Sequence, residues 1–153
     1  MSTEVSQRIR ALLQMLGMGE VTLPDEPVVS LSIDDKLTVN IGMADDSQVI
    51  TFFCSFGKLN EGDFQQAKQL LSSNLFSAQY PAAMAAIDDT TNDVILWTQL
   101  DLNATDDAEL FQAFETYINQ VEEHALVPEP GSKQLHQANQ MPTMSSNTFG
   151  VKV

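Results

Sequence analysis

The side chain best suited to covalent chemistry in this sequence is Cys54, the only cysteine. A nucleophilic cysteine needs a thiol pKa lowered by nearby cations, and some exposure to solvent. Cys54 lies inside the apolar run VITFFCSF, the nearest basic residue along the chain is Lys58, and both histidines, His124 and His136, are distant in sequence. A buried strand cysteine is therefore favoured over a nucleophile, and a single cysteine cannot form an internal disulfide.

Pairs of neighbouring aspartates are the other candidates for chemistry, because hard cations such as calcium bind clustered carboxylates. The pairs are Asp34–Asp35, Asp45–Asp46, Asp88–Asp89 and Asp106–Asp107. The alternating ligand spacing of a calcium loop, with its glycine and terminal glutamate, is absent. Three pairs fall in expected tight turns and the fourth at an expected helix start, where aspartate accepts hydrogen bonds from backbone amides. We interpret all four as turn and capping residues rather than as a metal site.

Neither a zinc site nor a known catalytic motif is indicated. Zinc usually needs three or four suitable ligands, and His124 and His136 are isolated. The sequence contains no GxGxxG, GxxxxGK[ST], GxSxG or HExxH motif. We therefore expect no active site, no metal and no cofactor.

Three segments have the apolar period of an amphipathic helix, close to 3.6 residues. They cover about residues 5–16, 64–75 and 106–123. Glycines follow the first segment and can terminate it, because glycine tolerates the left-handed conformation of a C-terminal cap. Asn60 is the expected N-cap of the second helix. Thr105 or Asp106 is expected to cap the third, where Asp106 and Glu109 have the spacing of a capping box.

Five runs are predicted to be strands, most of them from alternating apolar and polar residues. They cover about residues 29–33, 37–43, 49–56, 83–87 and 94–100. Short polar turns join the first three, which predicts an antiparallel meander, and the turn DDTTND joins the last two as a hairpin. The run VITFFCSF is apolar on nearly both faces, as in a central strand. The order α-β-β-β-α-β-β-α predicts an α+β fold with an antiparallel, twisted sheet and three helices.

The chain of 153 residues is strongly acidic, with 21 Asp and Glu against 7 Lys and Arg and a net charge of −14. No Lys or Arg occurs between Lys68 and Lys133, which argues against nucleic acid and against an anionic membrane surface as partners. No apolar run is long enough to span a bilayer, and the start MSTEVSQRIRALLQ lacks the features of a signal peptide. We expect a soluble cytoplasmic protein with one domain over residues 1–127. Residues 128–153 are expected to form a polar tail that is flexible or folds back.

The opening helix and first strands hold more apolar residues than a thin sheet layer and three helices can easily cover. Candidates for an uncovered groove are Leu12, Leu16, Val29, Leu31, Leu37, Val39 and Ile41. Plain core packing is the alternative for any one of them. For the group we expect some exposure, because an α+β domain usually leaves one sheet face to be covered. A partner segment could fill that face or add a strand at a sheet edge.

The order of elements resembles the Tir-chaperone family, the class I chaperones of type III secretion. The stretches that carry the likeness are ALLQMLGMG, VSLSIDDKLTVNIGMADDSQVITFFCSFGKL, QLLSSNLF, MAAIDDTTNDVILWTQLDL and AELFQAFETYINQVEEHA. Together they cover about residues 4–127. None is a catalytic signature, so the specific feature is their order and spacing. The tail after Val127 departs from the family pattern.

The resemblance implies a small acidic homodimer of the bacterial cytoplasm without enzymatic activity. Such a protein binds an N-terminal segment of a secreted effector and keeps it extended and competent for secretion; the ATPase of the secretion apparatus is a further implied partner. The implied effector-binding residues are Leu12, Leu16, Val29, Leu31, Val39 and Ile41. The implied dimer contacts are Leu70, Leu71, Leu75, Phe76, Met84 and Ile87.

Two other hypotheses stay open at this point. The chain could be a relative of these chaperones that acts as a regulatory interaction module without a secreted client. It could also be a small hydrolase or metal-dependent enzyme that uses Cys54 or an acid pair. Genes of a secretion apparatus beside its own gene would favour the chaperone over the regulatory module. Retention of all measurable function by Cys54→Ser would dismiss a thiol enzyme.

Overall fold

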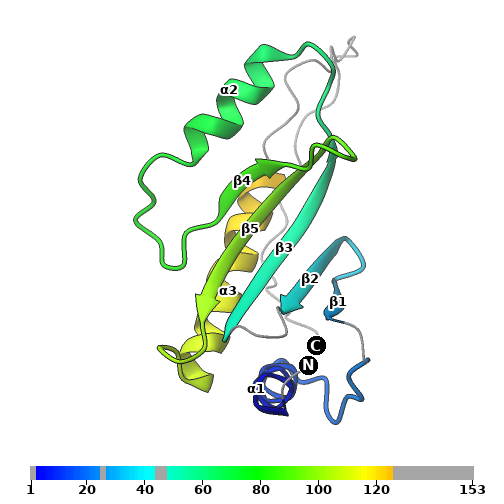
Figure 1. The fold of residues 1–153 in the computed structure, drawn as a ribbon, viewed down its shortest axis with the longest axis vertical. Helices are drawn as coiled ribbons and strands as arrows, with labels where there is room; N and C mark the ends of the chain where they lie inside the picture. The colour runs from blue at the N-terminus through cyan, green and yellow to red at the C-terminus, as the bar shows by residue number, and fades with distance from the viewer. Residues whose placement is uncertain (1–2, 25–26, 44–47, 126–153) are drawn as a thin grey trace, which may run out of the picture.

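A five-stranded antiparallel sheet carries two helices on one face, and a third helix lies outside one edge (Figure 1). The computed structural model describes residues 3–24, 27–43 and 48–125. The elements are α1 (Thr3–Met15), β1 (Val28–Ile33), β2 (Leu37–Met43), β3 (Val49–Lys58), α2 (Phe64–Ser73), β4 (Met84–Ile87), β5 (Asp93–Asp101) and α3 (Asp107–Ala125). The predicted α+β fold and its element order are therefore confirmed.

The strand order β1-β2-β3-β5-β4 follows from two local units, a meander and a hairpin. In the turn between β1 and β2 the Lys36 amide donates to the Ile33 carbonyl, and Asp34 and Asp35 have φ values of 49° and 55°. Aspartate tolerates this left-handed conformation, which suits a tight hairpin turn. The apolar run of β3 lies at the centre of the sheet, as predicted.

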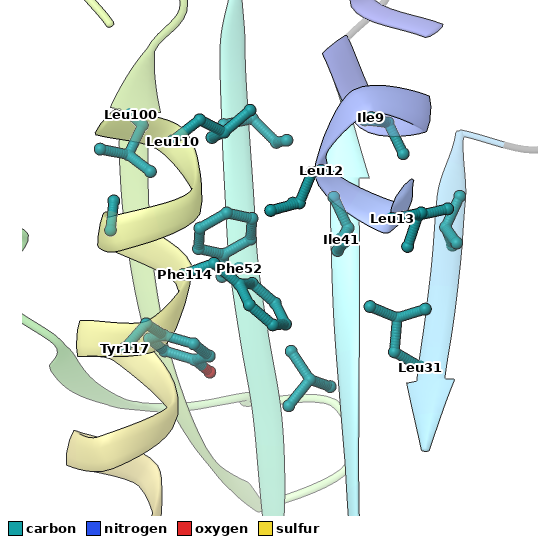
Figure 2. Packing of buried hydrophobic residues seen from close by; sticks show 14 of the residues in the cluster. Ile9, Leu12, Leu13, Leu31, Ile41, Phe52, Leu100, Leu110, Phe114 and Tyr117 are labelled. Carbon is teal, nitrogen blue, oxygen red and sulfur yellow. The ribbon is translucent and has the colours of Figure 1, made fainter. Parts of the chain in front are cut away.

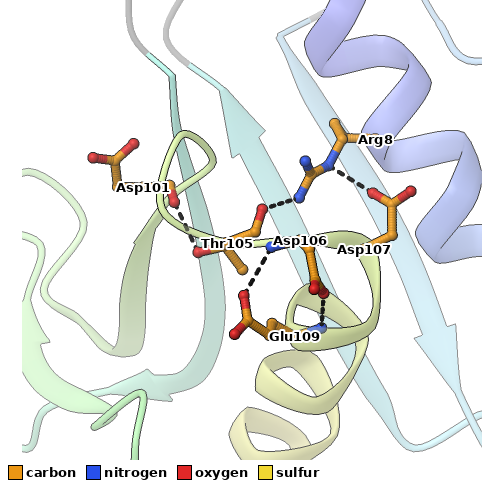
Figure 3. A network of polar contacts seen from close by, with 6 residues as sticks. All are labelled: Arg8, Asp101, Thr105, Asp106, Asp107 and Glu109. Carbon is orange, nitrogen blue, oxygen red and sulfur yellow. Dashed lines mark hydrogen bonds and ion pairs between the residues drawn. The ribbon is translucent and has the colours of Figure 1, made fainter.

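Capping residues fix where the helices begin. The predicted cap of the second helix is wrong: Asp63, not Asn60, accepts a hydrogen bond from the Gln66 amide, because the chain makes another turn before α2. The predicted capping box of α3 is confirmed. The Glu109 amide donates to the Asp106 carboxylate at 2.8 Å, and the Asp106 amide donates to the Glu109 carboxylate at 2.9 Å (Figure 3).

The core lies between the sheet and the layer formed by α1 and α3 (Figure 2). Phe52 of β3 is fully buried and packs edge-on against Phe114 of α3, with ring centroids 5.1 Å apart. The ring of Tyr117 also packs against Phe52, with centroids 5.8 Å apart, and the Tyr117 hydroxyl donates to the Leu96 carbonyl at 2.8 Å. Aromatic pairs of this geometry stabilise a core beyond the area they bury.

An ion pair connects the two helices that cover the sheet. The Nε of Arg8 in α1 lies 2.7 Å from a carboxylate oxygen of Asp107 at the start of α3. The same guanidinium donates to the Thr105 carbonyl (Figure 3). Arg8 therefore ties α1 to the N-terminal end of α3 and keeps α1 over the sheet.

Candidate functional site

The structure places Cys54 where it is unsuited to nucleophilic chemistry. Its side chain is buried in β3, and burial raises the pKa of the thiol, which disfavours the reactive thiolate. Burial also raises the pKa of Tyr117, with the nearby Cys54 as a smaller cause. Both groups therefore stay protonated and belong to the core.

Cys54 is expected to resist thiol reagents in the folded protein. Labelling at pH 8 should be at least about a thousandfold slower than in denaturant, since it requires opening of core structure. The matched control moves the thiol by one position, with Ser55→Cys in a Cys54→Ala background, because Ser55 is exposed on β3. That variant should label rapidly, and equal rates for the two proteins would contradict the buried assignment.

The other polar candidates are turn and cap residues where the structure describes them. The Asp88 carboxylate accepts hydrogen bonds from the amides of Thr90 and Thr91, which lower its pKa. Within the described ranges no group of three or more His, Cys, Asp or Glu is placed to hold a metal ion. Asp45–Asp46 and His136 lie outside the described residues.

One polar hollow of about 600 Å³ lies between α3 and the segment before β4. It is lined by Gln79, Tyr80, Thr116, Asn119, Glu122 and Glu123. Small-molecule sites are mostly apolar with a few convergent polar groups, so this lining does not resemble one. The candidate functional surfaces are instead surfaces suited to another polypeptide.

The groove predicted from α1 and the first strands is largely core. Leu12, Val29, Leu31, Val39 and Ile41 are each at most 6% exposed. The expectation that these five are uncovered is wrong, because α1 crosses this face of the sheet and packs against it (Figure 2). Leu16 and Leu37 are half-buried at the border of the core.

α2 is the helix that the chain leaves without cover. None of its residues is buried, and it lies beside β4, away from α1 and α3 (Figure 1). Large apolar side chains are exposed on it and on the segments that follow, and we call them the α2 patch: Phe64, Leu71, Leu75, Phe76, Tyr80 and Ile87. Leu71 is 72% exposed and Phe76 is 93% exposed. A cluster of this kind usually marks an interaction site.

The α2 patch contains four of the six residues implied as dimer contacts. Leu71, Leu75, Phe76 and Ile87 are exposed, whereas Leu70 in α2 and Met84 in β4 are half-buried. Phe64 and Tyr80 also lie on this surface, although neither was predicted as a contact residue. Helical spacing could have predicted this position for Phe64, because it lies four residues before Lys68 and seven before Leu71 and so shares their helix face.

A single asparagine attaches α2 to the sheet. The Asn74 amide group donates to the Ala85 carbonyl at 3.0 Å, and its oxygen accepts from the Ala85 amide at 2.6 Å. These groups lie on the side of β4 that faces away from β5, so Asn74 occupies the place of a neighbouring strand. Farther along, the Ala83 amide donates to the buried side chain of Gln120. The β4 edge is thus largely covered.

Asn74→Ala is expected to lower the free energy of unfolding by about 1–3 kcal/mol, because it leaves both Ala85 backbone groups without this partner. Urea unfolding measures the loss, and faster hydrogen exchange at the Ala85 amide locates it. Ser73→Ala is the control, since the Ser73 hydroxyl bonds only to the exposed Leu70 carbonyl one helical turn earlier. Equal losses in the two variants would contradict the anchoring role.

The opposite edge of the sheet, at β1, is open within the described residues. The Met43 amide donates to the Pro27 carbonyl, and hydrogen-bonded pairs alternate along an antiparallel ladder. The backbone groups of the odd-numbered residues of β1 therefore bond to β2. The backbone groups of Val28, Ser30 and Ser32 therefore face away from β2. Neither lysine nor a bulge protects this edge, and such an edge is a ready site for an added strand.

A family model matches residues 7–125, most of the chain: the Tir chaperone protein (CesT) family. The chain belongs to the Tir chaperone family. Its members are described as chaperones, so membership points to a protein-binding role and agrees with the resemblance noted from the sequence. No helix in the ranges 3–24, 27–43 and 48–125 is long and apolar enough to cross a membrane.

Solved structures share this fold at low sequence identity. The ExoT–SpcS complex from Pseudomonas aeruginosa matches with a TM-score of 0.63 and 20% identity, over 80% of this chain and 98% of that chain. The Yersinia pestis type III secretion chaperone SycH, in complex with a YscM2 fragment, matches with a TM-score of 0.60 and 21% identity, over 77% of this chain and 97% of that chain. The HopA1–SchA chaperone–effector complex matches with a TM-score of 0.66 and 10% identity, over 79% of this chain and 92% of that chain. No curated protein sequence matches the chain.

Proposed function

We propose that this Tir chaperone family member is a homodimeric type III secretion chaperone of the bacterial cytoplasm. It binds the N-terminal segment of a secreted effector in extended form and keeps it competent for secretion. The observation that carries the proposal is the pairing of two unpartnered surfaces on a chaperone-family fold, the α2 patch and the β1 edge. The secretion ATPase is a further proposed partner, at a step after the client is bound.

The α2 patch suits a second copy of the chain. Residues 64–87 contain no Asp or Glu, although the chain carries 21, and they contain one base, Lys68. Two copies can therefore approach through this surface without the repulsion that the rest of such an acidic surface would cause. A two-fold axis places the same apolar side chains on both sides, so each buried residue contributes twice.

The β1 edge suits an extended client. A strand added there pairs with the outward groups of Ser30 and Ser32 and lays alternate side chains against the border of the core. Leu16 is half-buried at that border, and Met15 and Met18 near the end of α1 are 46% and 50% exposed. In this arrangement the client contacts Met15, Leu16 and Met18, and the five buried residues of the predicted groove lie in the core beneath them.

The proposal is tested by capturing proteins on the tagged full-length chain in its native host and identifying them by mass spectrometry. After limited proteolysis on the resin, the retained peptides should come from one N-terminal segment of a protein that the host secretes. Export of that protein should fall when the chain is deleted. Absence of such a protein, or retention of a folded domain instead of a segment, counts against the proposal.

A paired substitution separates edge binding from nonspecific capture. Ser32→Pro removes an amide that faces away from β2, so it blocks strand addition while sparing the β1–β2 ladder. Ser32→Ala keeps that amide and serves as the control. We expect loss of the client with proline and retention with alanine. Retention by both would place the client elsewhere, and capture of a regulator that is never secreted would favour an interaction module.

A further inference from the structure

The two edges of the sheet are treated differently by the fold. Side chains of Asn74 and Gln120 occupy the β4 edge. At β1, the outward groups of Ser30 and Ser32 have no neighbouring strand among the described residues. Open edges pair readily with any extended segment, so proteins usually protect them. We therefore expect another segment to cover the β1 edge when no client is bound.

The surface beside β1 defines what that occupant must look like. On the α1 side, Leu16, Val21 and Ile33 are half-buried at the border of the core. On the other side, Ser30 and Ser32 are exposed. The aspartates Asp34 and Asp35 follow at the end of the strand. A fitting strand has an apolar face, a polar or small face, and no negative charge.

The end of this chain has that pattern. In the sequence TFGVKV, residues 148–153, apolar Phe149, Val151 and Val153 alternate with Gly150 and Lys152. This period of two is the signature of a strand with one apolar face. Residues 126–153 hold one acid and two bases, whereas residues 1–125 hold 20 acids and five bases. The net charge of the tail is thus opposite in sign to that of the acidic domain.

The connection is long enough. α3 ends at Ala125, and residues 126–147 form a connection of 22 residues. Extended, 22 residues reach about 75 Å, and as a flexible coil they span about 26 Å on average. A domain of about 125 residues is roughly 35 Å across. Residues 148–153 can therefore reach the opposite edge of their own sheet.

We propose that residues 148–153 add to β1 as an internal substitute for a client. Their backbone pairs with Ser30 and Ser32, and Phe149, Val151 and Val153 cover the border formed by Leu16 and Ile33. Lys152 lies on the opposite face, toward the exposed serines. The consequence rests on the proposed function: the tail competes with the client for the β1 edge, so the empty chaperone is shielded and a client must displace the tail.

Hydrogen exchange measured by NMR on the full-length chain tests the docking without any client. The variant Phe149→Asp/Val151→Asp disrupts the apolar face. The control, Ser145→Asp/Ser146→Asp, adds the same charge to the tail just outside residues 148–153 and leaves the proposed strand unchanged. A tethered segment acts at an effective concentration of about a millimolar, so a segment with a dissociation constant of about 0.1 mM slows exchange about tenfold. We expect that protection at the Ser30 and Ser32 amides in the wild type and control, and its loss in the first variant.

A peptide of residues 145–153 provides the reciprocal arm. Added to Phe149→Asp/Val151→Asp protein, it should restore protection at Ser30 and Ser32, and the same peptide with both aspartates should not. Equal exchange in all three proteins overturns the proposal. Protection that increases with protein concentration also overturns it, in favour of exchange between copies. If the tail docks on β1 but no client is captured, this inference holds and the proposed function fails. If a client is captured but the tail does not dock, the proposed function holds and this inference fails.

Discussion

Replacing Leu71 by aspartate is expected to convert the proposed dimer into a monomer of 16.8 kDa. Leu71 is 72% exposed in the single chain, so the change costs the protomer little. In a two-fold interface the same change occurs twice, and each copy loses the burial of a leucine, about 1.5–3 kcal/mol, and buries a carboxylate instead. The dimer dissociation constant should rise at least about a hundredfold.

Gln69→Asp is the matched control, because it adds the same charge to the same helix on a different face. Phe64 and Leu71 share one face of α2, and Gln69 lies well away from that face around the helix. Sedimentation or light scattering over a range of concentrations measures both variants, with circular dichroism to confirm intact helices. A monomeric wild type would contradict the dimer, and a Leu71→Asp protein as dimeric as the control would place the interface elsewhere.

Phe52→Ala is expected to cause the largest loss of stability, about 3–5 kcal/mol in the free energy of unfolding. Phe52 is fully buried and contacts the rings of Phe114 and Tyr117, so its removal leaves a cavity between β3 and α3. Small domains are stable by only about 5–15 kcal/mol. Urea unfolding should be measured at one fixed protein concentration, because the proposed dimer would make the apparent stability depend on concentration.

The neighbouring phenylalanine gives the control. Phe53 follows directly in β3, points to the opposite face of the sheet and is half-buried. Phe53→Ala removes the same atoms, so its smaller expected loss reports the difference between the two sheet faces. Equal losses would mean that the core does not lie on the α1–α3 face alone.

Patterns in neighbouring residues predicted most of the fold. The period of 3.6 identified the three helices, alternation identified the strands, and Asp106 with Glu109 identified the start of α3. These features depend on contacts within a few residues, which the sequence displays directly. The error at Asn60 has the same origin, since Asp63 three residues later offers equivalent chemistry and only the path of the intervening turn chose between them.

Which apolar faces stay open depended on contacts between elements far apart in the chain. Leu12 of α1 and Leu71 of α2 both belong to the apolar face of an amphipathic helix, and their local patterns are alike. Arg8 pairs with Asp107, about a hundred residues away, and α1 lies on the sheet with Leu12 buried. Asn74 attaches α2 to the rim of β4 and leaves Leu71 in solvent. An apolar face in a sequence predicts that the face is buried against something. Only the packing of distant elements decides whether that partner is the same chain.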